Sequence, residues 1–402
     1  MRATSMPKYF APAGTPIPTR VLMKWLAQSL SGKKSIETFR HAIEEKFHTF
    51  NCQFISSGRT ALYLALRDLR TLAPHPGADE VIIPSYTCYS VPGSVEKAGL
   101  KIRVCDIDPG TLSYDLDALN RFDFSKVLAI VSSNLYGFPN DLPAITNIAK
   151  QHNVFFIDDA AQSMGAMIAD QYAGTYGDVG IYSLDKGKNI TSIQGGIVVS
   201  NHAEFSQVFD ETVNSLPLQS SLSLMADTVK LCAYSLLLPP RYYWIAAKLL
   251  SLGTTPYTTD YPVHAYSEVM ANMAFTLFED LDKINSRRIH NAEYMIQTLE
   301  PYTSITPIHP VKQSKPVYLR LPLLISDNRN QIVDKLNAAG IGATTSYPEA
   351  IINVPQLRNS LDRRDLNCPG GCQVAKEIVT LPTQAYMNQQ SLDKTIDILI
   401  SS

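Results

Sequence analysis

The sequence has no excess of charge of either sign and has few cysteines. Its 402 residues include 35 lysines and arginines against 37 aspartates and glutamates, a formal net charge of −2. Because no basic surplus is available to neutralise phosphates, we expect no nucleic-acid partner. Six irregularly spaced cysteines do not resemble a disulfide framework and fit a reducing cytosol. We therefore expect a cytoplasmic protein, and the cysteines indicate no metal site.

Charged residues are also scarce, at 18% of the chain, against about 25% in ordinary globular domains. In a chain long enough for two domains, this indicates surface buried against another subunit. A long uninterrupted apolar run is missing as well. The most membrane-like stretch, 231–252, is broken by Pro239, Pro240 and Arg241 and contains Lys248, so we expect no membrane span. A buried or interface-facing helical pair is the main interpretation, and peripheral membrane contact through 242–244 is the alternative.

No G-x-G-x-x-G motif follows an early strand, so the simplest dinucleotide-binding fold is not indicated. Instead, short apolar runs typical of buried strands alternate with helix-like segments from residue 52 onward. The strand-like runs are CQFISSG, EVIIPSY, IRVCDID, VLAIVSS, VFFIDDA, DVGIYSL and GGIVVS. This alternation predicts an α/β fold whose mostly parallel central sheet has helices on both faces.

The C-terminal part has a different pattern. One long helix is expected over about 267–299, followed by strand-like VYLRLPLLI and helix-like QIVDKLNAAGI. We interpret this part as a smaller α+β domain. The predicted division is an N-terminal arm over 1–25, a large domain over 26–255 and a small domain over 256–402.

Four local features place reactive or small residues at strand ends. The turn Ser57-Gly58-Arg59 lies between a strand and a helix, where free N–H groups bind anions. Taken alone, this feature favours the alternative, an ordinary strand–helix turn. Asp158 and Asp159 end an apolar strand, where a buried carboxylate needs a cationic partner. A helix-capping role for one of the two acids is the alternative.

The other two features are a lysine-bearing loop and an aromatic turn. Ser183 stands five residues before Lys188, and a lysine amine can form a Schiff base with an aldehyde cofactor. A solvated basic turn is the alternative, because Lys186 is close by. Tyr86 or Tyr89 can stack on a flat ring or fill the core. Together, the four features supply the groups that bind pyridoxal phosphate (PLP).

The order of these motifs resembles the DegT-like sugar aminotransferases, which are PLP enzymes of fold type I. The resemblance covers nearly the whole chain. Counterparts exist for SSGRTAL, DEVIIPSYT, CDIDPGTLSYD, FIDDAAQSMGA, YSLDKGKN followed by QGG, and PGGCQVAKEIVTLP. The resemblance implies PLP as cofactor, glutamate as amino donor and a nucleotide-linked keto-sugar as acceptor. It also implies a homodimer with shared active sites.

Matching positions carry the family's phosphate and ring contacts. The resemblance implies that backbone amides at Gly58 and Arg59, together with the Ser183 hydroxyl, bind the cofactor phosphate. It also implies that Gln162 lies against the cofactor ring or its 3-hydroxyl.

The same resemblance assigns the catalytic pair. Lys188 would form the Schiff base and then move the proton, and Asp159 would pair with the pyridine nitrogen. Lys186 does not fit the family's spacing.

The chain also departs from the family. The family's ring-stacking aromatic aligns with Cys88 of this chain. Tyr89 or Tyr86 would then have to take over the stacking on the cofactor ring. No clear match exists for the segment that lends an Asn to the partner subunit's phosphate site. The side chains of Arg59 and Arg320 are either anion contacts or structural. A PLP- or PMP-dependent sugar dehydratase, a lyase on the same fold, and a non-catalytic regulatory homologue remain the alternatives.

Overall fold

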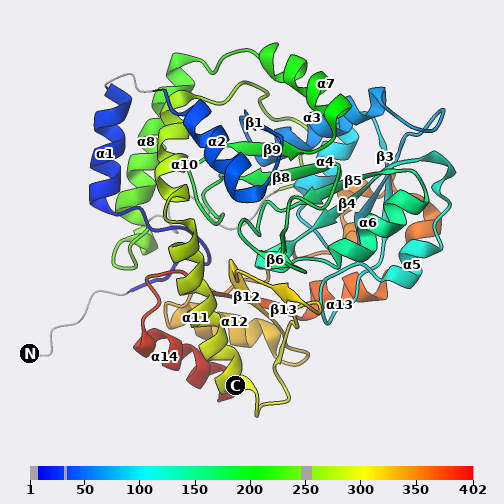
Figure 1. The fold of residues 1–402 in the computed structure, drawn as a ribbon. Helices are drawn as coiled ribbons and strands as arrows, with labels where there is room; N and C mark the ends of the chain where they lie inside the picture. The colour runs from blue at the N-terminus through cyan, green and yellow to red at the C-terminus, as the bar shows by residue number, and fades with distance from the viewer. Residues whose placement is uncertain (1–7, 31–33, 246–255, 402) are drawn as a thin grey trace, which may run out of the picture.

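The computed structural model describes residues 8–30, 34–245 and 256–401. Its largest sheet has seven strands in the order β1-β9-β8-β5-β4-β2-β3, and Figure 1 shows this sheet in the upper part of the molecule. The strands are β1 (Asn51–Ile55), β2 (Glu80–Pro84), β3 (Lys101–Cys105), β4 (Val127–Ser133), β5 (Phe155–Asp159), β8 (Val179–Ser183) and β9 (Gly196–Ser200). All seven predicted strands are confirmed.

The sheet is mostly parallel, as predicted. Strands β3, β2, β4, β5 and β8 pair in parallel, and β9 runs antiparallel to both β8 and β1. Strands β2, β4, β8 and β9 are buried at every position. Burial at every position explains why these sequences read as continuous apolar runs.

Helices cover both faces of this sheet, which confirms the predicted layers. One face packs against α3 (Gly58–Thr71), α4 (Ser90–Lys97) and α7 (Ala203–Asn214). The other face packs against α1 (Thr19–Leu30), α2 (Ile36–Phe47), α6 (Leu142–Gln151) and α10 (Glu268–Phe278). The short helix α5 (Leu116–Asn120) precedes β4. The carboxyl ends of β5 and β8 therefore meet at one edge of a rigid layered core.

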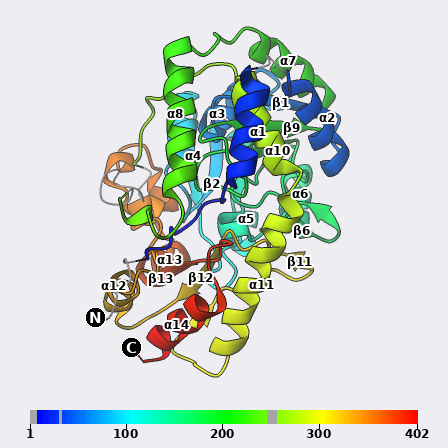
Figure 2. The same cartoon turned by 90° about the vertical axis from the view of Figure 1, so that its left-hand side faces the viewer.

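The single helix predicted over 267–299 is wrong. The structure has two helices there, α10 and α11 (Leu281–Leu299), separated by a turn at Glu279 and Asp280. The two helices differ in the hydrophobic cluster that buries most of each one. Most of α10 is buried against α1 and α2, whereas Met295 and Leu299 of α11 pack in the C-terminal cluster. Figures 1 and 2 show α11 passing from the large sheet to the C-terminal elements.

The C-terminal elements form a smaller sheet with helices, as the α+β prediction requires. Its antiparallel strands are β10 (Thr306–Pro307), β12 (Arg320–Leu324) and β13 (Ile378–Pro382), and its helices are α12 (Arg329–Ala338), α13 (Pro369–Glu377) and α14 (Gln389–Ile400). A further sheet joins β6 (Met167–Ile168), β7 (Gln171–Tyr172) and β11 (Ser314–Lys315). The boundary at residue 255 stays a prediction.

The described arm, residues 8–18, is extended and ends where α1 begins at Thr19. The Phe10 N–H donates to the Gly340 carbonyl and the Tyr9 N–H to the Pro240 carbonyl, both at 2.8 Å. Figure 2 shows the arm running from the C-terminal elements to the base of α1, beside α8 (Ser221–Leu237). The arm therefore bridges parts that lie far apart in the sequence.

Helix α8 contains residues 231–237 of the apolar stretch 231–252 noted above. Part of the second half falls on 246–255, outside the described residues. Across the residues that the structure does describe, no helix combines the length and the apolar character that a membrane crossing needs.

Candidate active site

Two adjacent carboxyls at the end of β5 point to opposite faces of the sheet, because side chains alternate along a strand. Asp158 is fully buried. Its Oδ2 accepts from the Gly174 N–H at 2.6 Å and the Tyr176 N–H at 3.3 Å, and its Oδ1 accepts from Asn134 Nδ2 at 2.7 Å. Burial raises the pKa of Asp158 to about 6, and these donors oppose that shift. Both oxygens of the Asp158 carboxyl thus already accept hydrogen bonds from neighbouring groups of the protein.

Asp159 is less occupied. Its Oδ1 accepts from the Ala161 N–H at 2.9 Å, and its Oδ2 has no hydrogen-bond partner among the described residues. Burial raises the Asp159 pKa, while the Ala161 N–H and the nearby charge of Lys188 lower it. One oxygen of this carboxyl is therefore free to accept a proton donor, which fits the role expected for Asp159.

The loop after β8, residues 184–189, is called the lysine loop here, and its two lysines have different surroundings. Lys186 is exposed, and its carbonyl accepts from the Tyr234 hydroxyl at 3.1 Å. Lys188 is partly buried, and its N–H donates to the Asp185 carbonyl at 3.1 Å. Within the described chain, Lys188 Nζ makes no hydrogen bond or ion pair. Its charge lowers the pKa of Asp159, so Lys188 is the lysine of this loop whose amine acts electrostatically on the available carboxyl.

The turn from β1 to α3 lies directly against the end of β8. Ser57 caps α3 by accepting from the Thr60 N–H at 3.1 Å. A Cβ at Gly58 would lie 3.0 Å from Ser183 Cβ, and one at Gly196 would lie 2.4 Å from the Ser57 carbonyl oxygen. These close approaches bring the helix N-terminus and the Ser183 hydroxyl together. Such a pairing of free N–H groups and a hydroxyl suits an anion.

The side chains of the two flagged arginines differ in their hydrogen bonds. The Arg59 guanidinium lies over the Tyr261 ring, 5.1 Å from its centroid, but its buried Nε has no hydrogen-bond partner among the described residues. Arg320 donates to the Thr344 hydroxyl at 3.0 Å. The Arg320 contact favours the structural interpretation of that side chain, whereas an anion contact by the Arg59 side chain stays a prediction.

The aromatic turn divides into one buried and two partly buried side chains. Tyr86 is 1% exposed, and its hydroxyl lies 3.4 Å from that of Tyr136. The Tyr89 hydroxyl donates to the Glu349 carbonyl at 3.0 Å. Cys88 is partly buried, and its sulfur accepts from the Ser90 hydroxyl at 3.0 Å. Which of them faces a cofactor ring stays a prediction.

Tyr347 is a member of this group that the sequence analysis missed. Its hydroxyl accepts from Gln162 Nε2 at 3.0 Å, and the Gln162 Oε1 accepts from the Tyr136 N–H at 3.1 Å. The Tyr347 ring lies 5.8 Å from that of Tyr86 and 5.7 Å from that of Tyr89. No local pattern marks Tyr347, because it comes from the C-terminal part, 185 positions after Gln162.

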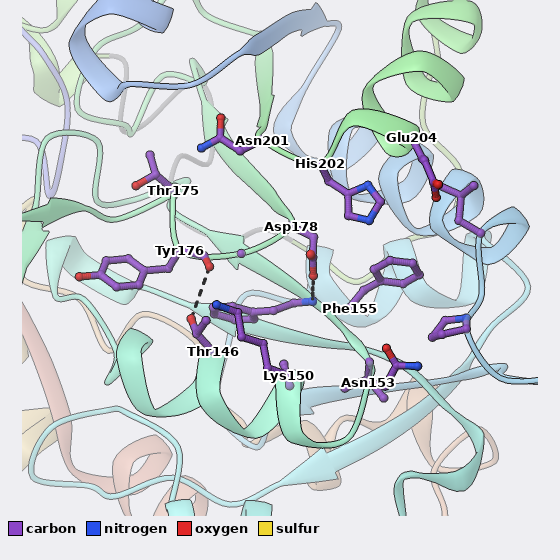
Figure 3. Close-up of a pocket in the computed structure, with 16 residues that line it drawn as sticks. Thr146, Lys150, Asn153, Phe155, Thr175, Tyr176, Asp178, Asn201, His202 and Glu204 are labelled. Atoms are coloured by element: carbon purple, nitrogen blue, oxygen red, sulfur yellow. Dashed lines mark hydrogen bonds between the residues drawn. The ribbon is translucent and has the colours of Figure 1, made fainter.

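A groove of about 610 Å³ lies away from this group, at the other end of β5. Its lining includes Phe155 at the start of that strand, Lys150, Asp178 and His202, and Figure 3 shows these side chains. The Asp178 carboxylate accepts from the Phe156 N–H at 2.8 Å. This groove contains none of the predicted site residues. In the described part of the chain, no cluster of three or more His, Cys, Asp or Glu residues could hold a metal ion.

Solved structures with the same architecture define the class of fold. An aminotransferase of Helicobacter pylori, PseC, involved in the biosynthesis of pseudoaminic acid, superposes with a TM-score of 0.78 at 16% identity, over 98% of this chain and 99% of its own. The E. coli GDP-4-keto-6-deoxy-D-mannose-3-dehydratase with bound hydrated PLP gives 0.78 at 19% identity, over 98% and 100%. The fold is that of the fold type I PLP enzymes, as predicted.

The family follows from the sequence itself. Residues 22–215 and 264–400 match the DegT/DnrJ/EryC1/StrS aminotransferase family, and the chain belongs to this family. A GDP-perosamine synthase of Caulobacter vibrioides is 26% identical over 361 residues, 88% of this chain and 85% of that protein. A GDP-4-keto-6-deoxy-D-mannose 3-dehydratase of Yersinia pseudotuberculosis is 34% identical over 177 residues, 44% of this chain and 45% of that protein. Matches to several curated relatives thus span less than half of those proteins.

Proposed function

We propose that the chain is a PLP-dependent aminotransferase that moves an amino group from glutamate to a keto-sugar. The observation that carries this proposal is a pair of groups left available in the described chain: the unpaired amine of Lys188, and the Asp159 carboxyl with one oxygen free. Both lie at the carboxyl ends of neighbouring strands of the sheet, where α/β folds bind their ligands.

The residues present fit PLP. The turn at Gly58 and the Ser183 hydroxyl offer donors to a phosphate, and Asp159 Oδ2 is free to accept a ring N–H. Gln162 lies three residues beyond Asp159, with its side chain fixed by Tyr136 and Tyr347. When bound, PLP supplies an electron sink for breaking a bond at the amino-acid Cα.

The protein's own groups have distinct tasks in this proposal. Lys188 Nζ attaches the cofactor and, once released, accepts and returns the proton of the donor's Cα as general base and acid. Asp159 keeps the ring nitrogen protonated through a charge-assisted hydrogen bond. Gly58, Arg59 and Ser183 bind the phosphate and fix the orientation of the ring.

The acceptor in this proposal is a keto-sugar linked to a nucleotide. Two kinds of relative support it: the GDP-perosamine synthases, and a UDP-N-acetyl-3-dehydro-alpha-D-glucosamine 3-aminotransferase of Acidithiobacillus ferrooxidans that is 35% identical over 153 residues. The product would serve the synthesis of a surface polysaccharide or of a secondary metabolite.

A sugar dehydratase is the second candidate, because a 34% identical relative has that name. The resemblance expects histidine in place of the reactive lysine in that branch. The partly buried, unpaired Lys188 therefore favours transamination.

We further propose a cytoplasmic homodimer with neighbouring active sites. Helix α8 exposes Leu222, Met225 and Val229 to 73%, 59% and 62%, and large exposed apolar patches mark interfaces. On another face of α8, Tyr234 donates to the Lys186 carbonyl, so this helix connects the exposed patch with the lysine loop. Light scattering of the wild type and of Val229→Asp tests this: a dimer that dissociates in the variant supports it, and a monomeric wild type contradicts it.

The activity test combines the purified protein, PLP, glutamate and a panel of GDP- and UDP-linked keto-sugars, analysed by mass spectrometry. We expect a visible cofactor band and a product with the mass change of a carbonyl converted to an amine. Loss of a sugar hydroxyl oxygen would instead indicate the dehydratase. A protein that takes up no PLP would exclude both.

A further inference from the structure

Arg288, in the middle of α11, is a buried cation without a carboxylate partner among the described residues. It is 1% exposed. Its NH1 donates to the Asn189 carbonyl at 3.1 Å, and its NH2 donates to Thr15 Oγ1 at 3.0 Å and lies 3.3 Å from the Gly14 carbonyl. The Lys188 carbonyl lies 3.5 Å from NH2. Burial lowers the pKa of Arg288 to about 10, so the group remains charged at neutral pH.

This arrangement differs from that of the other deeply buried arginine. Arg103 forms ion pairs of 2.6 Å with both Glu80 and Asp365. Burying a charge costs several kcal/mol unless partners compensate. At Arg288 the compensation comes from carbonyl and hydroxyl oxygens, and two of those carbonyls belong to Lys188 and the residue after it.

Thr15 completes the same contact from the N-terminal arm. Its hydroxyl lies 2.7 Å from the Asn189 carbonyl and 3.1 Å from the Lys188 carbonyl, and it accepts from Arg288. The Thr15 N–H donates to the Tyr234 hydroxyl at 2.9 Å, which fixes the arm against α8. The arm and α11 therefore both contact the backbone of the lysine loop.

The lysine loop needs such support. Residues 184–189 follow Ser183, the last residue of β8, and belong to no helix or strand. The Lys188 N–H donates to the Asp185 carbonyl within the loop. The Lys188 carbonyl, in contrast, is contacted by Thr15 and Arg288, which lie outside the loop. Because a reactive group displaced by about 1 Å can lose about 10²-fold in rate, fixing this carbonyl fixes the direction of the amine.

We propose that Arg288 and Thr15 are positioning residues that hold the Lys188 backbone and so aim its amine. This rests on the proposed function, in which Lys188 is the reactive amine. A merely structural Arg288 would stabilise the fold without changing how fast Lys188 reacts.

The test uses Thr15→Val, which keeps the side-chain shape and removes the hydroxyl, together with Arg288→Lys and Arg288→Met. The matched control is Arg287→Met, because Arg287 is the adjacent arginine on α11 and its NH2 lies 3.4 Å from the Met387 carbonyl instead. Three readouts are compared for the full-length protein. They are the rate at which borohydride traps added PLP on Lys188, kcat and KM for glutamate, and the melting temperature.

We expect Thr15→Val and Arg288→Lys to slow trapping and lower kcat by about tenfold, with the glutamate KM within about twofold. Arg288→Met is expected to lose more, and Arg287→Met to match the wild type. If Arg288→Met fails to fold, the trapping rate and kcat of Thr15→Val test the proposal.

Unchanged trapping per folded molecule in Thr15→Val would overturn the proposal, as would equal losses in Arg287→Met. Failure of the proposed function looks different, because the wild type itself would then trap no PLP.

Discussion

Asp158 and Asp159 are adjacent in the chain, yet the two sides of β5 use them in opposite ways. On one side, Asp158 accepts from two backbone N–H groups and from Asn134 and has no exposed surface. On the other side, Asp159 keeps one oxygen without a hydrogen-bond partner in the described chain, and the charge of Lys188 lowers its pKa. The difference teaches that a carboxyl at a strand end becomes available for chemistry only where the fold leaves it without donors.

The same contrast separates the two lysines of the loop. Lys186 is exposed to solvent, whereas Lys188 is partly buried and its charge lowers the pKa of Asp159. The predictions below test whether the Asp159 side is reactive and the Asp158 side structural.

Lys188→Ala should have the largest effect. Removing the amine takes away both the covalent attachment and the proton carrier, so we expect transamination to fall by at least about 10³-fold. No PLP should be trapped at position 188 by borohydride, as peptide mass spectrometry would show. Lys186→Ala is the matched control and should keep wild-type activity. A Lys188→Ala protein with full transamination would refute the assignment.

Asp159→Asn should come next. The amide cannot keep a ring nitrogen protonated, so we expect kcat/KM for glutamate to fall by about 10²-fold or more, similar to the loss of a main electrostatic contact. The Ala161 N–H retains an acceptor, so the melting temperature should change little. Steady-state kinetics and a thermal scan check both statements. A strong loss of stability with unchanged kinetics would reverse the roles of the two acids.

Asp158→Asn should affect stability instead. Both carboxyl oxygens accept hydrogen bonds, and an amide offers one acceptor, so at least one buried donor loses its partner. We expect a loss of about 2 kcal/mol in the free energy of unfolding, measured with urea. The folded variant should still trap PLP on Lys188. An unchanged free energy of unfolding would contradict this prediction.

The pH dependence of stability should also identify Asp158. Its pKa is raised from 3.8 to about 6 in the folded state, so the folded protein binds this proton more tightly than the unfolded chain. Stability from this group is greatest below its unfolded pKa and falls as the pH rises to about 6, by about 3 kcal/mol in total. The free energy of unfolding of the wild type minus that of Asp158→Asn should show this decline with pH. A difference that does not change with pH would exclude the prediction.

The fold could be predicted well because its signals are local. The central strands are buried on both faces, so each one is a short apolar run, and the helices between them follow from the alternation. The pattern failed at 267–299. The apolar spacing continues through Glu279 and Asp280, and the structure alone shows that α11 begins in the core of α10, at Leu281, and ends in the C-terminal core, at Met295 and Leu299.

The candidate site was predictable only in part, for the same reason. Asp159, Ser183 and Lys188 lie in motifs that the chain presents in order. The contacts that fix their surroundings are long-range: Thr15 reaches Lys188 across 173 positions, and Arg288 across 100. No spacing rule connects such residues, because the tertiary fold alone brings them together.

Tyr347→Phe should have the smallest effect, and it tests how far the Asp159 side extends. The Tyr347 hydroxyl accepts from Gln162 Nε2, so its removal leaves Gln162 free to turn away from a bound ring. Because a hydrogen bond contributes about 0.5–1.5 kcal/mol net, PLP should bind about two- to tenfold more weakly. Tyr89→Phe is the matched control, since the hydrogen bonds of the Tyr89 hydroxyl within the described residues go to the Glu349 backbone. Equal PLP affinities in Tyr347→Phe and the wild type, measured by titration of the visible band, would place Tyr347 outside the site.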